Sequence, residues 1–123
     1  MKILIVDDSS AMRMIVRRTL RQAGFDGHDI VEAGNGREAL LRMREGMPDI
    51  ILSDWNMPDI DGMALLTAVR TAKLRIPFGF ITAQGSPEMR ERARAAGANF
   101  LISKPFTDEV FRDIVGPYLQ PSR

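Results

Sequence analysis

The stretch DIILSDWNMPDIDG, residues 49–62, decides the fold of this chain. It opens with the apolar run Ile-Ile-Leu at residues 50–52, which is too short for a helix and typical of a buried strand. Asp54 follows almost at once, and neither Pro58 nor Gly62 can continue a strand interior. Asp54 is therefore predicted to lie where a buried strand stops. In a parallel α/β sheet that edge binds ligands, although a lone strand-end aspartate can equally be a helix cap or a turn former.

The composition is that of one globular domain. The chain has 123 residues, 45% of them hydrophobic and 27% charged, which is enough for a proper core. Lys and Arg number 17 against 16 Asp and Glu, so no basic field favours nucleic acid. There is no cysteine, and the first apolar run, residues 3–6, is far too short for a signal peptide or membrane span. We therefore expect a single domain over residues 1–123, monomeric and cytoplasmic, with no nucleic-acid or membrane partner.

Strand patterns and helix patterns alternate along the whole chain. The predicted strands cover residues 3–6, 29–33, 50–52, 78–81 and 99–102. The predicted helices begin near the capping residues Ser9 or Ser10, Asn35, Asp61, Ser86 and Thr107. Gly116-Pro117 is expected to end the last helix early. Five strands alternating with five helices predict a parallel sheet covered on both faces.

Polar and charged side chains follow four of the predicted strands. Asp7 and Asp8 end the first, Asp54 the third and Thr82 the fourth, and Lys104 closely follows the fifth. Three converging carboxylates would repel one another without a cation, and with no cysteine and one histidine in the chain the ligands favour Mg²⁺ over zinc. A metal, an ammonium and a hydroxyl around one carboxylate suit a phosphoryl transition state. The carboxylate itself can be the nucleophile, giving an aspartyl phosphate.

Four short motifs, in this order, carry a family resemblance. VDDS (6–9), SDWNMPDIDG (53–62), ITA (81–83) and SKPF (103–106) resemble the receiver domain of two-component response regulators, in particular its stand-alone CheY-like form. The resemblance covers essentially the whole chain. It implies a doubly wound, flavodoxin-like (βα)5 fold whose parallel five-stranded sheet has the order 2-1-3-4-5.

The resemblance also implies roles for site residues. Asp54 would be the phosphoacceptor. Asp8 would bind Mg²⁺ directly and Asp7 mainly through water, while Asp54 and the backbone carbonyl of Asn56 would complete the protein ligands.

Lys104 and Thr82 would bind the phosphoryl group, and the Lys104-Pro105 peptide bond would be cis. The implied donor is a sensor histidine kinase or a histidine phosphotransfer protein. The implied target, such as a flagellar motor switch, would bind the surface of helix 4, strand 5 and helix 5. Beyond its own phosphorylation and dephosphorylation, no enzyme activity is expected.

Three positions depart from the family pattern. Leu101 stands where an aromatic residue is usual, and the neighbouring Phe100 should point to the opposite face of the sheet. Gln84 stands where an acidic residue is frequent, which bears on the phosphate lifetime. Gly116-Pro117 interrupts a helix that usually continues.

Other interpretations stay open. Arg13, Arg17 and Arg21, with Arg18 beside them, form a stripe on the first helix that is either a solvated face or a docking surface. The single histidine, His28, lies in a predicted turn away from the strand-end edge. The rival functions are a phosphate shuttle to a histidine phosphotransfer protein, a Mg²⁺-dependent phosphatase with an aspartate nucleophile, and a flavodoxin-like cofactor binder.

Overall fold

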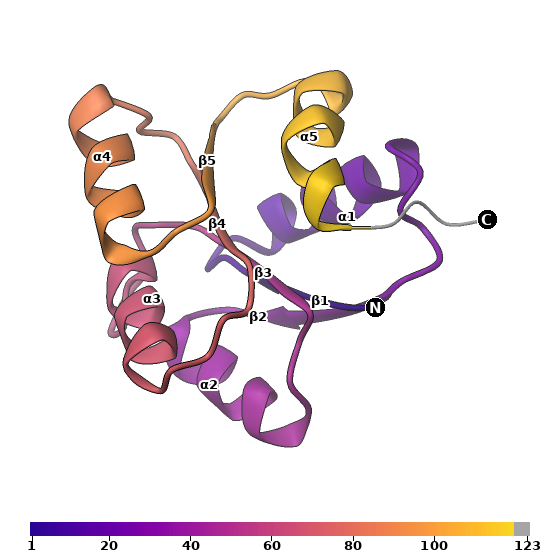
Figure 1. Cartoon of the computed structure of the whole chain (residues 1–123). Helices are drawn as coiled ribbons and strands as arrows, with labels where there is room; N and C mark the ends of the chain where they lie inside the picture. The colour runs from indigo at the N-terminus through magenta and orange to yellow at the C-terminus, as the bar shows by residue number, and fades with distance from the viewer. Residues whose placement is uncertain (120–123) are drawn as a thin grey trace.

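The computed structural model describes residues 1–119 and consists of alternating strands and helices (Figure 1). The elements are β1 (Lys2–Val6), α1 (Ser10–Gln22), β2 (Asp29–Ala33), α2 (Gly36–Glu45), β3 (Ile50–Ser53), α3 (Gly62–Thr71), β4 (Phe78–Thr82), α4 (Pro87–Ala96), β5 (Phe100–Ser103), α5 (Asp108–Val115) and the 3-10 turn η1 (Gly116–Tyr118). All strand pairs are parallel, and the sheet order is β2-β1-β3-β4-β5. The predicted doubly wound (βα)5 fold is confirmed.

Helices cover both faces of the sheet. α1 and α5 pack together on one face, whereas α2, α3 and α4 follow one another across the other (Figure 1). Side chains of a strand alternate between the two faces: in β1, Ile3 and Ile5 join the core under α1 and α5, while Leu4 and Val6 join the opposite core. No helix within the described residues is long and apolar enough to cross a membrane.

The helix boundaries follow the capping residues in the sequence. The side chain of each predicted cap accepts a hydrogen bond from the backbone N–H three residues later; these caps are Ser9, Asn35, Asp61, Ser86 and Thr107. Such a cap typically contributes about 1 kcal/mol. α5 ends at Val115 and the chain turns into η1, as Gly116-Pro117 predicted.

The last strand lies one residue later than predicted. β5 runs from Phe100 to Ser103, not from Asn99 to Ile102, because its register pairs Ser103 with Thr82. The Asn99 side chain accepts a hydrogen bond from the Phe78 N–H and thereby holds the start of β4.

Gly79 has a structural role that the sequence did not indicate. It lies opposite Phe100 in the sheet register, and a Cβ atom at Gly79 would lie 1.9 Å from the Phe100 ring. The ring occupies the space left by the missing side chain and packs against Tyr118 at a centroid distance of 5.3 Å. Gly79 therefore makes room for the Phe100 ring.

Candidate functional site

Backbone hydrogen bonds carry the sheet one residue beyond its strands and place the charged residues. The Asp54 N–H donates to the Val6 carbonyl at 2.8 Å, and the Asp7 N–H donates to the Ala33 carbonyl at 3.1 Å. In the β4–β5 pair at the edge of the sheet, the Lys104 N–H donates to the Thr82 carbonyl at 2.8 Å. The strand ends of β1, β3 and β5 therefore deliver their side chains to one edge. The Lys104-Pro105 peptide bond is cis, as the resemblance implied.

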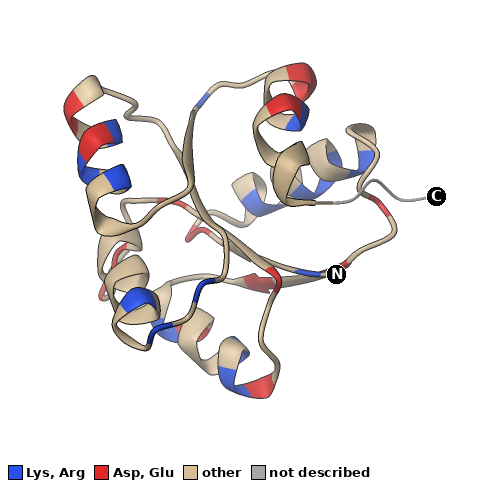
Figure 2. Ribbon diagram, viewed as in Figure 1, with Lys and Arg blue, Asp and Glu red and all other residues tan. Residues whose placement is uncertain are grey.

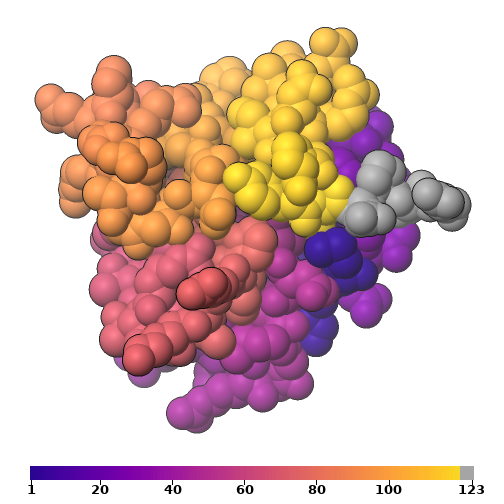
Figure 3. Space-filling model, in the orientation of Figure 1, coloured from indigo at the N-terminus to yellow at the C-terminus, as the bar shows by residue number. Residues whose placement is uncertain are grey.

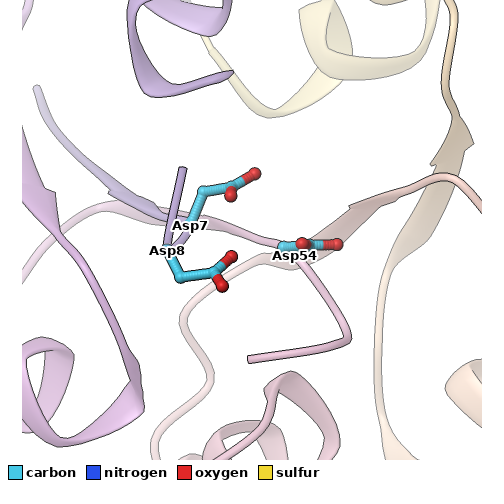
Figure 4. Close-up of side chains that lie close together, drawn as sticks. All are labelled: Asp7, Asp8 and Asp54. Carbon is cyan, nitrogen blue, oxygen red and sulfur yellow. The ribbon is translucent and has the colours of Figure 1, made fainter. Parts of the chain in front are cut away.

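The three aspartates form a tight acidic cluster. Asp7, Asp8 and Asp54 each offer a carboxylate oxygen, and these atoms lie within 4.8 Å of one another. Figure 4 shows Asp7 and Asp8 beside Asp54, with the three carboxylates turned to the same side. Asp7 is buried, Asp54 is half-buried and Asp8 is exposed, so the cluster opens to solvent on the side of Asp8.

Lys104 is the cation that pairs with this cluster. Its Nζ lies 3.2 Å from Asp7 Oδ2 and 3.7 Å from Asp54 Oδ1. One ammonium cannot balance three carboxylates, so the cluster keeps a net negative charge. That residual charge is the electrostatic reason for a cation to bind here.

The environment of Asp54 makes the charged form of its carboxyl less favourable than it is in water. Burial raises the pKa of the Asp54 carboxyl above its ordinary value; Lys104 opposes this effect, and the charges of Asp7 and Asp8 add to it. The Trp55 N–H also opposes it by donating to Asp54 Oδ1 at 2.8 Å. Gly62 packs against the same peptide, since a Cβ there would lie 2.1 Å from the Asp54 carbonyl oxygen.

The residue after Asp54 extends the site into the core. Trp55 is buried and stacks on Phe80 with ring centroids 4.7 Å apart. The Arg92 guanidinium of α4 also lies over the Trp55 ring, 5.5 Å from its centroid. Trp55 is therefore placed to report, by its fluorescence, on changes at the site and at α4.

The other two residues predicted for the site, Thr82 and Asn56, lie at the end of β4 and shortly after β3. Thr82 is 1% exposed at the end of β4, and its hydroxyl accepts a hydrogen bond from the Gln84 N–H at 3.3 Å. Asn56 is exposed two residues after Asp54. Leu101 is buried on the face of α3 and α4, and Phe100 lies in the opposite core, so the prediction about their directions is confirmed.

Two arginines of the stripe on α1 form ion pairs with β2, and the other two are exposed to solvent. Arg13 Nη1 donates to the Asp7 carbonyl at 2.6 Å, and both Arg13 and Arg17 pair with Glu32 of β2. Arg18 and Arg21 are exposed, and basic bands run along α1 in Figure 2. Arg13 is thus a support for the acidic cluster that sequence reasoning missed, because its spacing resembled that of a solvated face.

Comparison with known proteins assigns the family. The model for the response regulator receiver domain matches residues 3–116. The chain therefore belongs to the receiver domains of response regulators, the family of two-component signalling.

Its relatives include chemotaxis proteins. It is 40% identical over 115 residues to the chemotaxis protein CheY of Pseudomonas aeruginosa, covering 92% of this chain and 91% of that one. A CheY homologue of Campylobacter jejuni is also 40% identical, with 92% and 88% covered. The structure of chemotaxis protein CheY4 of Vibrio cholerae superposes with a TM-score of 0.83 at 35% identity, covering 96% and 98% of the two chains.

The acidic cluster fits the divalent cation that receiver domains bind. Mg²⁺ prefers hard oxygen ligands, takes one or two carboxylates and keeps several waters. Three carboxylate oxygens within 4.8 Å of one another, open to solvent at Asp8, meet these requirements. Asp8 and Asp54 would hold the ion, with Asp7 behind them.

Proposed function

We propose that this chain is a stand-alone, CheY-like response regulator in which Asp54 accepts a phosphoryl group from a phosphohistidine on a partner protein. The observation that carries the proposal is the acidic cluster at the strand ends, with the Lys104 ammonium 3.7 Å from Asp54. In this proposal the site phosphorylates and dephosphorylates the chain's own Asp54, so the protein is a switch and acts on no separate substrate.

The proposed reaction moves one phosphoryl group. An Asp54 carboxylate oxygen forms a bond to phosphorus as the bond between phosphorus and the donor imidazole nitrogen breaks. The leaving imidazole keeps the electron pair and is protonated, and Asp54 becomes an acyl phosphate. Hydrolysis returns the carboxylate and inorganic phosphate. Bound Mg²⁺ would neutralise the phosphoryl oxygens and the carboxylates that face them.

Two side chains of this chain would stabilise the transferred group. The Lys104 ammonium lies close enough to Asp54 to pair with an equatorial phosphoryl oxygen. The Thr82 hydroxyl can donate a hydrogen bond to another phosphoryl oxygen once it turns from the Gln84 amide. A carboxylate at position 84 would help to orient the water that hydrolyses the acyl phosphate, and the Gln84 amide cannot act as a base in this way. We therefore propose that the Gln84 side chain controls the lifetime of the phosphate.

The donor would dock against α1. The groove between α1 and the chain after β5 has a volume of about 440 Å³ and is lined by Met12, Ile15, Arg18 and Phe106, with Lys104 at its edge. Its mostly apolar lining, which includes Lys104, suits a helix that presents a phosphohistidine. A reversal of charge at the exposed Arg18 should slow transfer from a phosphohistidine donor and leave labelling by acetyl phosphate unchanged. The same reversal at Arg44 on α2 is the control.

The output would leave through α4, β5 and α5. α4 and α5 cover opposite faces of the sheet, and both pack on its edge strand β5; Figure 3 shows α4 in orange and α5 in yellow on the visible surface of the molecule. Trp55 and Arg92 link α4 to Asp54. A protein target such as a flagellar motor switch is the proposed reader, and relay to a histidine phosphotransfer protein is the alternative. Binding of the phosphorylated chain to each candidate, compared with the unphosphorylated chain, distinguishes the two.

Intact mass spectrometry tests the proposal. After incubation with acetyl phosphate and Mg²⁺, the wild-type chain should gain one phosphate, and chelation of Mg²⁺ should abolish the gain. The Asp54→Asn variant should gain none. Labelling of Asp54→Asn to the level of the wild type, or continuous turnover without a stable adduct, would contradict the proposal.

A further inference from the structure

One arginine on α4 ties three separate segments together next to the site. Arg90 Nε donates to the Gly85 carbonyl at 3.2 Å, in the loop after β4. Its Nη1 donates to the Leu101 carbonyl at 3.0 Å, and its Nη2 donates to Ser103 Oγ at 3.0 Å. A single guanidinium therefore joins the first turn of α4 to the preceding loop and to β5.

The acceptors explain why arginine is suited to this position. β5 is an edge strand, so part of its carbonyl row faces away from the sheet and needs a partner. The planar guanidinium fork can reach a strand carbonyl, a hydroxyl and a loop carbonyl at once, which a lysine ammonium on its flexible stem cannot do with the same geometry. The loop also lies directly on the strand, because a Cβ at Gly85 would be 1.8 Å from Ser103 Oγ.

The loop that Arg90 holds is the one that begins at Thr82. The Thr82 hydroxyl accepts a hydrogen bond from the Gln84 N–H, and the Thr82 carbonyl accepts one from the Lys104 N–H. If the hydroxyl turns toward a phosphoryl group on Asp54, it loses the Gln84 bond and the loop follows. A movement of the loop away from α4 and β5 would then stretch or break the bond between Arg90 Nε and the Gly85 carbonyl.

We propose that Arg90 is a positioning residue that holds the loop of residues 83–86 in the unphosphorylated conformation and thereby weakens phosphoryl binding at Asp54. This inference rests on the proposed function. A phosphoryl group bound at Asp54 shifts the loop equilibrium only by its differential affinity for the two loop conformations. By linkage, any contact that stabilises the unphosphorylated loop lowers the affinity for the phosphoryl group, and its removal raises that affinity.

The test compares two arginines on the same helix. Arg94, one turn after Arg90, pairs with Glu91 on its own helix and has a 72% exposed side chain. Beryllofluoride with Mg²⁺, a phosphoryl analogue, is titrated into wild-type, Arg90→Gln and Arg94→Gln proteins while Trp55 fluorescence is recorded. Loss of a hydrogen bond of ordinary net strength changes an equilibrium constant about two- to tenfold, so Arg90→Gln should bind about that much more tightly. Arg94→Gln should match the wild type.

Two further variants distinguish the loss of the Arg90 hydrogen bonds from the loss of its charge, and thermal melts exclude a loss of folding. Arg90→Lys keeps the positive charge but not the fork, so it should resemble Arg90→Gln. Ser103→Ala removes one of the three acceptors and should shift the affinity in the same direction by less. Thermal melts establish that each variant is folded before titration.

A second readout follows the arginine directly. The Nε–H resonance of Arg90 in ¹⁵N NMR spectra should shift when beryllofluoride binds to the wild type, because its bond to the Gly85 carbonyl is lost. Unchanged or weaker binding by folded Arg90→Gln, or an equal gain in Arg94→Gln, would overturn the role of Arg90 while leaving the proposed function intact. Failure of the wild type to bind beryllofluoride would remove the proposed function and this inference with it.

Discussion

Replacement of Asp54 by asparagine should make the metal-free protein more stable. The change removes one of three clustered carboxylates and keeps an oxygen that can accept the Trp55 N–H. Asp54 and each of the other two aspartates have carboxylate oxygens within 4.8 Å of each other, and at that limit the repulsion in each pair is worth about 3.5 kcal/mol at an effective dielectric constant of about 20. The attraction to Lys104 at 3.7 Å is worth about 4.5 kcal/mol on the same scale.

The sum of these interactions is a net repulsion. Burial of the Asp54 charge increases the destabilisation, and screening by water at the exposed Asp8 reduces it. We expect Asp54→Asn to raise the free energy of unfolding by about 1–3 kcal/mol at neutral pH. For a domain of this size a gain of about 2 kcal/mol corresponds to a rise in Tm of roughly 5 to 10 °C. The assay is urea and thermal unfolding in chelator, and the control is Asp113→Asn on the exposed side of α5, expected within about 0.5 kcal/mol of the wild type.

The gain should depend on pH and on metal. Burial raises the pKa of Asp54 in the folded state above its ordinary 3.8, so the charge penalty is fully present above the raised pKa. As the pH falls through that value the penalty shrinks, and below 3.8 it disappears because the carboxyl is protonated in both states. Saturating Mg²⁺ should also reduce the gain, since the variant lacks one ligand. Equal or lower stability of Asp54→Asn without metal, or a gain that Mg²⁺ does not reduce, would refute the electrostatic account of the site.

Three further variants test other parts of the structure. Leu101→Ala should lower the free energy of unfolding by about 2–4 kcal/mol because the side chain is buried. The amide NMR shifts on beryllofluoride binding should nevertheless remain large from Thr82 to Met89. Loss of those shifts in a variant that still accepts phosphate would make Leu101 a switch residue. Gly79→Ala should cost about 1–3 kcal/mol, because its Cβ would overlap the Phe100 ring, and a melt equal to the wild type would show that the ring moves freely. Lys104→Gln should slow labelling by acetyl phosphate by about 10²-fold while Mg²⁺ binding, followed by Trp55 fluorescence, is retained. An unchanged labelling rate would remove Lys104 from the mechanism.

The fold was predictable because local signals agreed with one another. Each helix begins at a side chain that can cap it, and each buried strand is a short apolar run between turn residues. The approach of Asp7, Asp8 and Asp54 also followed from sequence, since parallel strands with helical crossovers must bring their carboxyl ends to one edge.

The features that sequence did not predict depend on register and on long side chains. The shift of β5 to residues 100–103 was set by the pairing of Ser103 with Thr82. The fit between Gly79 and Phe100 joins positions far apart in sequence that become opposite only in the sheet. Arg13 and Arg90 occupy helix positions with the spacing of solvated residues. Each donates to a backbone carbonyl, and such an acceptor leaves no trace in the sequence.

Chemical identification of the modified residue tests the central claim most directly. Borohydride reduces an acyl phosphate to the alcohol, so phosphorylated aspartate becomes homoserine, which peptide mass spectrometry can place in the chain. After treatment with acetyl phosphate and Mg²⁺, we predict homoserine at position 54 and unmodified aspartate at Asp7 and Asp8. Homoserine at Asp7 or Asp8, or its absence from a chain that has gained a phosphate, would contradict the assignment of Asp54 as the phosphoacceptor.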